Sequence, residues 1–243
     1  MKKPTIAVLV VAYNAQDTLE TVLDRIPESF IPEISTVLVC DDASTDETTA
    51  VVTNYMVQSR LPITVVTHPI NRGYGGNQKF GYSWAIEHGI DIVILLHGDG
   101  QYAPEELPRM AAPIVEGHAD VVFGSRMLNR FQARKGGMPL YKYVGNIFLT
   151  TLQNWLVGTS LSEWHSGYRA YRVSSLAAVD LESNSNEFDF DTQIILQMVA
   201  TDQRIREIEI PTFYGEEISH VNSVKYGLQI LRHTIRYRLA RRS

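Results

Sequence analysis

The sequence is poor in cysteine and has no long apolar run. Cys40 is the one cysteine among 243 residues, which excludes a framework of internal disulfides and is compatible with a reducing compartment. Because Cys40 lies in the apolar run "STVLVC", we interpret it as a buried thiol rather than a nucleophile. No uninterrupted apolar stretch reaches the roughly 18 to 20 residues that a membrane-spanning helix needs. We therefore expect a globular, cytoplasmic protein.

Familiar glycine-rich nucleotide motifs are also missing. No Walker lysine motif is present, and the loop "NRGYGGNQ" follows the third expected strand and lacks the third glycine of a dinucleotide loop. The N-terminal "MKKPTIAVLVVAY" has two lysines before an apolar run but no small-residue cleavage site, so we expect a first core strand rather than a signal peptide. We find no internal repeat and no low-complexity tract.

Acidic residues are absent from the C-terminal end. Residues 220–243 hold six Lys or Arg and no acid, although the chain as a whole carries a net charge of -5. This distribution argues against nucleic-acid binding and permits contact with an anionic membrane surface. We divide the chain into a catalytic body, 1–219, and a basic amphipathic helix, 220–243. One face of that helix holds Val224, Leu228, Leu231, Ile235 and Leu239. Packing on the body or on a second copy in an oligomer is the alternative to membrane contact.

Strands and helices alternate over the first 125 residues. The expected strands are "TIAVLVVAY", "ISTVLVCDD", "PITVVTH", "DIVILLH" and "ADVVFGSR", with helical segments between them. This order is typical of an α/β fold with a mostly parallel, Rossmann-like sheet and helices on both faces. After Arg126 we expect a basic loop, an apolar helix over 140–157 and further C-terminal helices.

Polar or glycine residues follow all five expected strands. Because ligands of parallel sheets bind at the carboxyl ends of the strands, this pattern predicts a ligand site at that edge. In "LLHGDGQ", the side chains of His97, Asp99 and Gln101 alternate, so an extended strand tip would aim them at one point. That arrangement favours a metal site. A polar turn that ends the strand is the alternative.

These segments together carry a family resemblance. The stretches "VLVVAYNAQDTLETVL", "VCDDASTDETTAVV", "NRGYGGNQKFGYSWAIEHG", "LLHGDGQYAPEELPRM", "FGSR" and "SGYRAY" occur in the order seen in glycosyltransferase family 2. Over roughly residues 5–220 the chain resembles the dolichyl-phosphate mannose synthase-like branch. The resemblance implies a GT-A fold, a nucleotide-sugar donor, inverting sugar transfer, and Mn²⁺ or Mg²⁺ held by an Asp-x-Asp motif.

The resemblance also implies roles for individual residues. Along the nucleoside, or in support of it, it places Tyr13, Asn14, Asp41, Asp42, Gly73, Asn77 and Gly98. For the metal it implies Asp99 and Gln101 with His97, which stands where many relatives have the first aspartate; a hydrogen bond from His97 to a phosphate or to Asp99 is the alternative. For phosphate and acceptor it implies Lys142, Ser166 and Gly167, and for catalysis Asp99, Arg126 and Arg169.

The acceptor depends on whether the site holds a base. A hydroxyl acceptor needs a base to remove its proton, whereas a lipid phosphate is already ionised and needs cations. Candidate bases are Glu163, His165, Asp189 and Asp191, and the candidate cations are Arg130, Arg134, Lys135, Lys142 and Arg169. We favour a polyprenyl phosphate as acceptor, with the apolar helix 140–157 beside it. The alternatives are a core helix at 140–157, a glycan or protein hydroxyl acceptor, a sugar nucleotidyltransferase, and a non-catalytic sugar-nucleotide-binding module.

Overall fold

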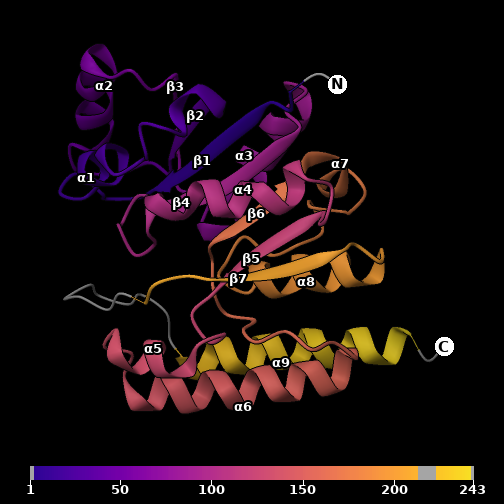
Figure 1. The fold of residues 1–243 in the computed structure, drawn as a ribbon. Helices are drawn as coiled ribbons and strands as arrows, with labels where there is room; N and C mark the ends of the chain where they lie inside the picture. Colours follow the sequence, from indigo (N-terminus) through magenta and orange to yellow (C-terminus); the bar gives the residue numbers. More distant parts are fainter. Residues whose placement is uncertain (1–2, 213–222, 242–243) are drawn as a thin grey trace.

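A mixed seven-stranded sheet forms the centre of the molecule (Figure 1). The structure is a computed structural model and describes residues 3–212 and 223–241. The strand order is β3-β2-β1-β4-β6-β5-β7, and only β6 runs antiparallel to its neighbours in this sheet. The strands are β1 (Ile6–Ala12), β2 (Ile34–Asp41), β3 (Ile63–Thr67), β4 (Ile92–His97), β5 (Val121–Ser125), β6 (Arg169–Arg172) and β7 (Ile205–Glu209). The expected α/β class with a mostly parallel sheet is confirmed.

Helices cover both faces of the sheet. One apolar core joins the sheet to α1 (Leu19–Asp24), α2 (Thr48–Gln58) and α4 (Leu107–Val115). A second core, on the opposite face, joins it to α3 (Tyr74–Glu87), α7 (Val173–Leu176) and α8 (Phe190–Ala200). The central strands β1 and β4 read as continuous apolar runs because both of their faces are covered.

Strand register aligns the ends of the central strands. Ala12 at the end of β1 pairs with Asp41 of β2, and Val11 pairs with His97 of β4. The antiparallel strand β6 begins at this same edge, where Arg169 pairs with Leu95 and Phe123. The loop that precedes β6 therefore reaches the carboxyl ends of the parallel strands.

Three helices form a separate layer at one end of the molecule. They are α5 (Arg130–Lys135), α6 (Leu140–Val157) and α9 (Ser223–Ala240), and α9 packs against α6 and α8 (Figure 1). In α6 the apolar side chains of Tyr141, Phe148 and Trp155 face solvent, while Asn146 and Gln153 are buried. Val157, Tyr143 and Ile147 of this helix pack in apolar clusters, so the alternative of a core helix at 140–157 holds for one side of the helix. Among the helices of the described residues, none is long and apolar enough to cross a membrane.

The predicted C-terminal helix is present as α9. Of its predicted apolar face, Leu228, Ile235 and Leu239 are exposed and Leu231 is partly buried. The boundary predicted between 219 and 220 and the side chain of Val224 lie outside the described residues. The division into body and helix stays a prediction.

Candidate functional site

The end of β1 presents an exposed aromatic side chain. Tyr13 is 52% exposed, and Asn14 adopts a left-handed conformation with φ of 50°. The Asn14 side chain holds that turn, because its Oδ1 accepts a hydrogen bond from the backbone N–H of Thr45 at 2.9 Å. The backbone N–H of Asn14 donates to Ser44 Oγ at 2.9 Å. The loop after β2 is thus tied to the end of β1, with the Tyr13 ring left open to a ligand.

Two buried carboxylates end β2. Asp41 accepts hydrogen bonds from the hydroxyls of Ser44 and Thr49, so it holds the turn after β2. Asp42 accepts a hydrogen bond from the backbone N–H of Arg72 at 2.7 Å. Burial raises the pKa of Asp42, and the Arg72 N–H opposes that rise. The pair therefore joins the ends of β2 and β3 into one wall of the site.

The glycines of "NRGYGG" pack against the protein's own backbone. Gly73 has a φ of +81°, and a Cβ there would lie 2.6 Å from the carbonyl oxygen of Asn186. At Gly75 a Cβ would lie 2.6 Å from the Ser185 carbonyl oxygen, and the Gly75 N–H donates to Asn186 O at 2.7 Å. We expected these glycines to allow contact with the nucleotide. The structure gives another reason for them, because residues 185–186 approach their backbone closely.

Asn77 lies inside the protein instead of lining the edge. Its Nδ2 donates to the carbonyl oxygen of Cys40 at 2.9 Å, and its Oδ1 lies 3.2 Å from His68 Nε2. The side chain is 2% exposed. The expectation that Asn77 contacts the nucleoside is corrected to a role in holding α3 against β2, since a buried amide must satisfy its hydrogen bonds within the protein.

The three predicted metal ligands at the tip of β4 differ in local structure and exposure. The strand ends at His97, which is 8% exposed, whereas Asp99 is exposed and Gln101 partly buried. Asp99 lies in a turn in which its Oδ1 accepts from the Gln101 N–H at 2.9 Å and Gly100 has a φ of +77°. The extended strand that we predicted through these residues ends at His97, so a turn rather than strand alternation presents Asp99.

His97 lies in an aromatic cluster that the sequence analysis missed. Its Nε2 is 3.4 Å from the Tyr74 hydroxyl, and its ring meets the Tyr102 ring edge-on at 4.8 Å between centroids. A Cβ at Gly167 would lie 2.9 Å from His97 Nε2, so only glycine fits there. Burial lowers the pKa of His97, against the opposing charge of Asp99, and keeps the imidazole neutral. In the sequence, the one indication of this cluster is the tyrosine in each of the two loop motifs, Tyr74 in "NRGYGG" and Tyr102 in "GDGQY".

Gly98 lies against the end of β1. A Cβ at this position would approach the Ala12 Cβ to 3.2 Å, and the Gly98 N–H donates to Val11 O at 2.9 Å. Packing between strands thus accounts for this glycine, which we expected at the nucleotide. It also holds the turn that carries Asp99 against the end of β1.

The donor groups suit a cation that is shared with a substrate. Within residues 3–212 and 223–241 no cluster of three or more His, Cys, Asp or Glu side chains could hold a metal ion. Mg²⁺ keeps several waters and binds through one or two carboxylates plus substrate phosphates. The exposed carboxylate of Asp99 fits that mode, in which a diphosphate supplies the other ligands, and the neutral imidazole of His97 stands beside it.

A buried ion pair follows β5. Arg126 donates to Glu163 from its backbone N–H at 2.8 Å and from its guanidinium, which is 8% exposed. Asn146 of α6 donates to the same carboxylate at 2.8 Å. Burial raises the pKa of Glu163, but Arg126 outweighs it and holds that pKa below its usual value. Glu163, which we considered as a base, is therefore the counter-ion of Arg126.

Arg169 does not reach the surface. Its guanidinium is 1% exposed, donates to the carbonyl oxygens of Ser166 and Asp191, and lies over the Phe123 ring. The expected contact with the acceptor is corrected to a role in fixing the loop before β6 against α8. The N–H of Gly167 donates to the Tyr102 hydroxyl at 2.6 Å and holds the loop on its other side.

The remaining site residues divide between the loop before β6 and the helical layer. The buried Ser166 hydroxyl accepts from the Tyr168 N–H at 3.4 Å, and Lys142 lies partly exposed in the first turn of α6. His165 bonds through Nδ1 to the Tyr226 hydroxyl of α9 at 3.2 Å, and burial lowers its pKa to about 4. Its Nε2 has no hydrogen-bond partner within the described part of the chain.

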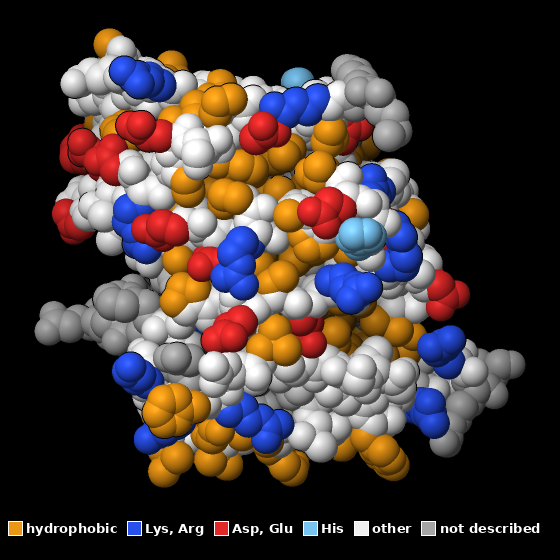
Figure 2. Space-filling view, in the orientation of Figure 1, with side chains coloured by type: hydrophobic (Ala, Val, Ile, Leu, Met, Phe, Trp, Pro, Cys, Tyr) orange, Lys and Arg blue, Asp and Glu red, His pale blue; other side chains and the backbone are white. Residues whose placement is uncertain are grey.

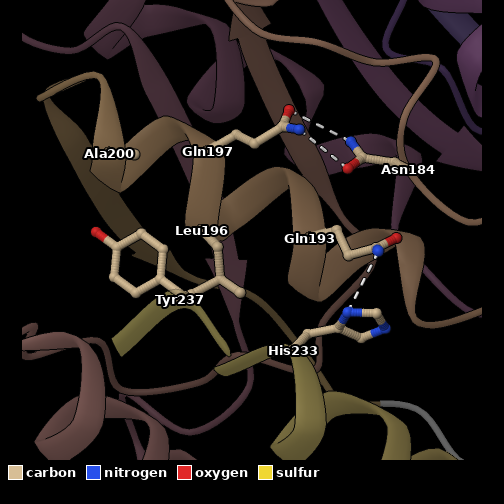
Figure 3. Close-up of a pocket in the computed structure, with 7 residues that line it drawn as sticks. All are labelled: Asn184, Gln193, Leu196, Gln197, Ala200, His233 and Tyr237. Atoms are coloured by element: carbon tan, nitrogen blue, oxygen red, sulfur yellow. Dashed lines mark hydrogen bonds between the residues drawn. The ribbon is translucent and has the colours of Figure 1, made fainter. Parts of the chain in front are cut away.

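A shallow pocket of about 190 Å³ lies elsewhere, between α8 and α9 (Figure 3). Its lining residues are Asn184, Gln193, Leu196, Gln197, Ala200, His233 and Tyr237. Gln197 and Asn184 bond to each other, and Gln193 reaches His233, so the polar groups of this pocket are largely engaged. No residue from the predicted strand ends lines it, and we do not assign the site to it.

Comparison with known proteins identifies the family. Residues 7–179 match the family model for glycosyl transferase family 2. An undecaprenyl-phosphate mannosyltransferase of Micrococcus luteus is 29% identical, over 95% of this chain and 97% of its own. A UDP-N-acetylglucosamine–dolichyl-phosphate N-acetylglucosaminyltransferase of Methanococcus voltae is 25% identical, over 95% and 94%.

Solved structures agree on the fold. The glucosyl-3-phosphoglycerate synthase of Mycobacterium tuberculosis, in complex with Mn²⁺, uridine diphosphate and phosphoglyceric acid, superposes with a TM-score of 0.72. It is 16% identical, and the match covers 97% of this chain and 78% of that chain. The matched family segment contains β1 to β6 and the site that their ends form. The chain belongs to glycosyl transferase family 2, as a glycosyltransferase of GT-A fold in the dolichyl-phosphate mannose synthase-like branch.

Proposed function

We propose that the protein transfers a sugar, with inversion, from a UDP- or GDP-sugar to a polyprenyl phosphate in the cytoplasm. The observation that carries the proposal is the exposed carboxylate of Asp99 just after β4, at the edge where β4 neighbours β1 and where the exposed Tyr13 follows β1. The named relatives act on undecaprenyl and dolichyl phosphates, which supports the same class of acceptor.

The donor would lie along the ends of β1, β2 and β4. Tyr13 offers a ring face to the base, and the turn held by Asp41 and Asn14 forms the adjoining wall. Asp99 would hold a divalent cation, Mn²⁺ or Mg²⁺. When bound, such a cation stabilises the charge that develops on a nucleoside diphosphate as the sugar departs.

The state of the four candidate bases favours an acceptor that is already ionised. Glu163 is paired with Arg126, and Asp191 accepts a hydrogen bond from Tyr74 at 3.0 Å. Asp189 is paired with His233 at 2.8 Å. His165, with a pKa of about 4, is a weak base at neutral pH. A lipid phosphate needs no base and can attack the sugar directly from the face opposite the diphosphate, which gives inversion.

Binding and transfer can be measured in sequence on the full chain. Calorimetry with UDP and GDP should show that one of them binds, and binds more tightly with Mn²⁺ or Mg²⁺ present. The corresponding UDP- or GDP-sugars are then offered with undecaprenyl phosphate or, as the matched control, undecaprenol. We expect transfer to the phosphate only. No binding of either nucleotide at millimolar concentration would contradict the donor assignment, and equal transfer to undecaprenol would contradict the acceptor assignment.

A further inference from the structure

Helix α6 has its amphipathic pattern turned outward. Tyr141, Val144, Phe148 and Trp155 follow one another at spacings of three, four and seven, which places them on one helical face. They are 67%, 55%, 63% and 75% exposed. The opposite face packs on the body and is mixed, with the buried polar residues Asn146, Thr150 and Gln153 and the apolar residues Tyr143, Ile147 and Val157. In a helix that only packs on a core the apolar face turns inward, so the outward face of α6 lacks a partner.

Neighbouring helices extend this apolar surface. Phe131 of α5 is 74% exposed, Leu140 at the start of α6 is 61% exposed, and α9 adds Leu228, Ile235 and Leu239. We call these residues, together with the four exposed apolar residues of α6, the basal face. Figure 2 shows hydrophobic side chains together with Lys and Arg along the end of the molecule that this helical layer forms.

The same helical layer carries an excess of positive charge. Residues 127–162 contain four Lys or Arg and no acid, and residues 223–242 contain six and no acid. The rest of the chain holds the other 12 Lys and Arg and all 27 Asp and Glu. A second copy bound through the basal face would bring two cationic layers together. A partner with negative charge and an apolar interior meets both properties of the face.

We propose that the basal face binds the surface of an anionic lipid bilayer, with α6 and α9 lying in the interface. Aromatic and aliphatic side chains insert at the boundary between headgroups and acyl chains, while Lys and Arg contact the headgroups, as in interfacial amphipathic helices. Exposed Arg130 and Lys135 of α5 and Arg232 and Arg236 of α9 are placed for that contact. The docking surface follows from exposure and charge and does not depend on the proposed acceptor.

Docking would also bring the site close to the lipid. The buried side of α6 supplies Asn146, which hydrogen-bonds Glu163, the counter-ion of Arg126. On α9, Tyr226 bonds His165 in the same loop. The two helices that meet the bilayer are therefore the helices that hold the loop before β6 at the strand ends.

Vesicle binding tests the proposal directly. The full chain is mixed with vesicles of phosphatidylcholine alone or with about one third phosphatidylglycerol, and bound protein is measured by flotation. We expect binding to the anionic vesicles that weakens with salt. Trp155 is exposed, Trp84 partly buried and Trp164 buried, so lipid-borne quenchers should act mainly on Trp155. The variant Trp155→Phe should lose that quenching while it still floats.

Matched variants decide whether the basal face is responsible. The double variant Phe148→Ser, Trp155→Ser should lower the partition coefficient about tenfold or more, because each substitution removes a large apolar group from the interface. The control Val57→Ser, Ile70→Ser alters side chains that are 82% and 72% exposed on the acidic part and should bind like the wild type. Arg130→Glu with Lys135→Glu should weaken binding by about tenfold or more.

Three outcomes would overturn the proposal. They are absence of binding to anionic vesicles at low salt, equal binding by the Phe148→Ser, Trp155→Ser variant, and a dimer in solution that this variant dissociates. The last outcome would assign the face to a second copy. Transfer to a water-soluble, short-chain polyprenyl phosphate is measured in parallel, so that failure of docking and failure of the proposed activity are distinguishable.

Discussion

Helices of the sheet body and of the helical layer have the same amphipathic periodicity, but they turn their apolar faces in opposite directions. In the body, helices α1 to α4 bury their apolar faces on two cores, and polar groups collect at the strand ends. In the layer, α6 buries Asn146 and Gln153 and exposes Phe148 and Trp155. An apolar stripe thus identifies the face of a helix that avoids water, but it does not say whether protein or another apolar phase covers that face.

Charge separates the two regions in the same way. The sequences of α5, α6 and α9 contain no Asp or Glu. Apart from the two acids within residues 213–222, all Asp and Glu residues belong to the body. The regions meet at a buried group formed by Arg126, Glu163 and Asn146. Substitutions in this buried group should therefore have the largest effect on how the two regions are joined.

The largest expected effect is the loss of the junction's buried charge. In Glu163→Gln, Arg126 stays buried without its counter-ion, and the free energy of unfolding should fall by about 3 to 5 kcal/mol in urea titrations. The same change in the exposed Lys3–Glu33 pair, Glu33→Gln, is the control and should cost less than about 1 kcal/mol.

This effect has a defined pH dependence. Because the pKa of Glu163 is depressed in the folded protein, its stabilisation is present above the usual pKa of Glu and is lost as pH falls through the folded value. The gap in stability between wild type and Glu163→Gln should therefore narrow below about pH 4.5. Equal losses for Glu163→Gln and Glu33→Gln would show that the two regions are not joined through this pair.

The second effect concerns the acidic strand end and leaves the helical layer untouched. Asp99→Asn keeps the side-chain size and removes the exposed charge, so the melting temperature should stay close to wild type. Turnover should fall about 100-fold or more, since a contact that stabilises charge in the transition state is worth roughly 3 kcal/mol. The control Glu87→Gln changes a carboxylate at the C-terminal end of α3, the end away from Tyr74, and should leave turnover unchanged. Near-normal turnover of Asp99→Asn would remove the metal from the proposed mechanism.

The smallest expected effect is a pH dependence of stability that arises at His165, where the body contacts α9. Burial lowers the pKa of His165 from 6.5 to about 4, so the unfolded chain binds the proton more tightly. Stability then falls as pH drops from about 7.5 to 5, with His165 contributing about 2 kcal/mol of that loss and His97 adding in the same direction. In His165→Asn the loss measured in urea should be smaller by this amount. The exposed His118→Asn is the control, and equal slopes for both variants would contradict the assignment.

The positions of the strands and the edge that carries the site could be predicted from the sequence. Continuous apolar runs such as "IVILLH" specify buried strands, and their alternation with helices specifies parallel pairing. Tyr13, Asp41 and Asp99 were therefore placed at the correct edge. Strand register and the antiparallel insertion of β6 depend on contacts between distant segments, and no local pattern reports them.

Individual roles at that edge required the fold. Arg126 and Arg169 have the same side chain, and the family resemblance implies a catalytic role for both. Packing pairs Arg126 with Glu163 and encloses Arg169 among Ser166, Phe123 and Asp191, whose carboxylate lies 3.6 Å from the guanidinium. Glycines at 73, 75 and 167 likewise fit close neighbours that come from far along the chain. Local sequence specifies periodicity, charge and the residue types at strand ends, because these depend on the chain's own chemistry. Which side chains face solvent and which face each other is decided only when the segments pack, because burial and pairing are properties of neighbours.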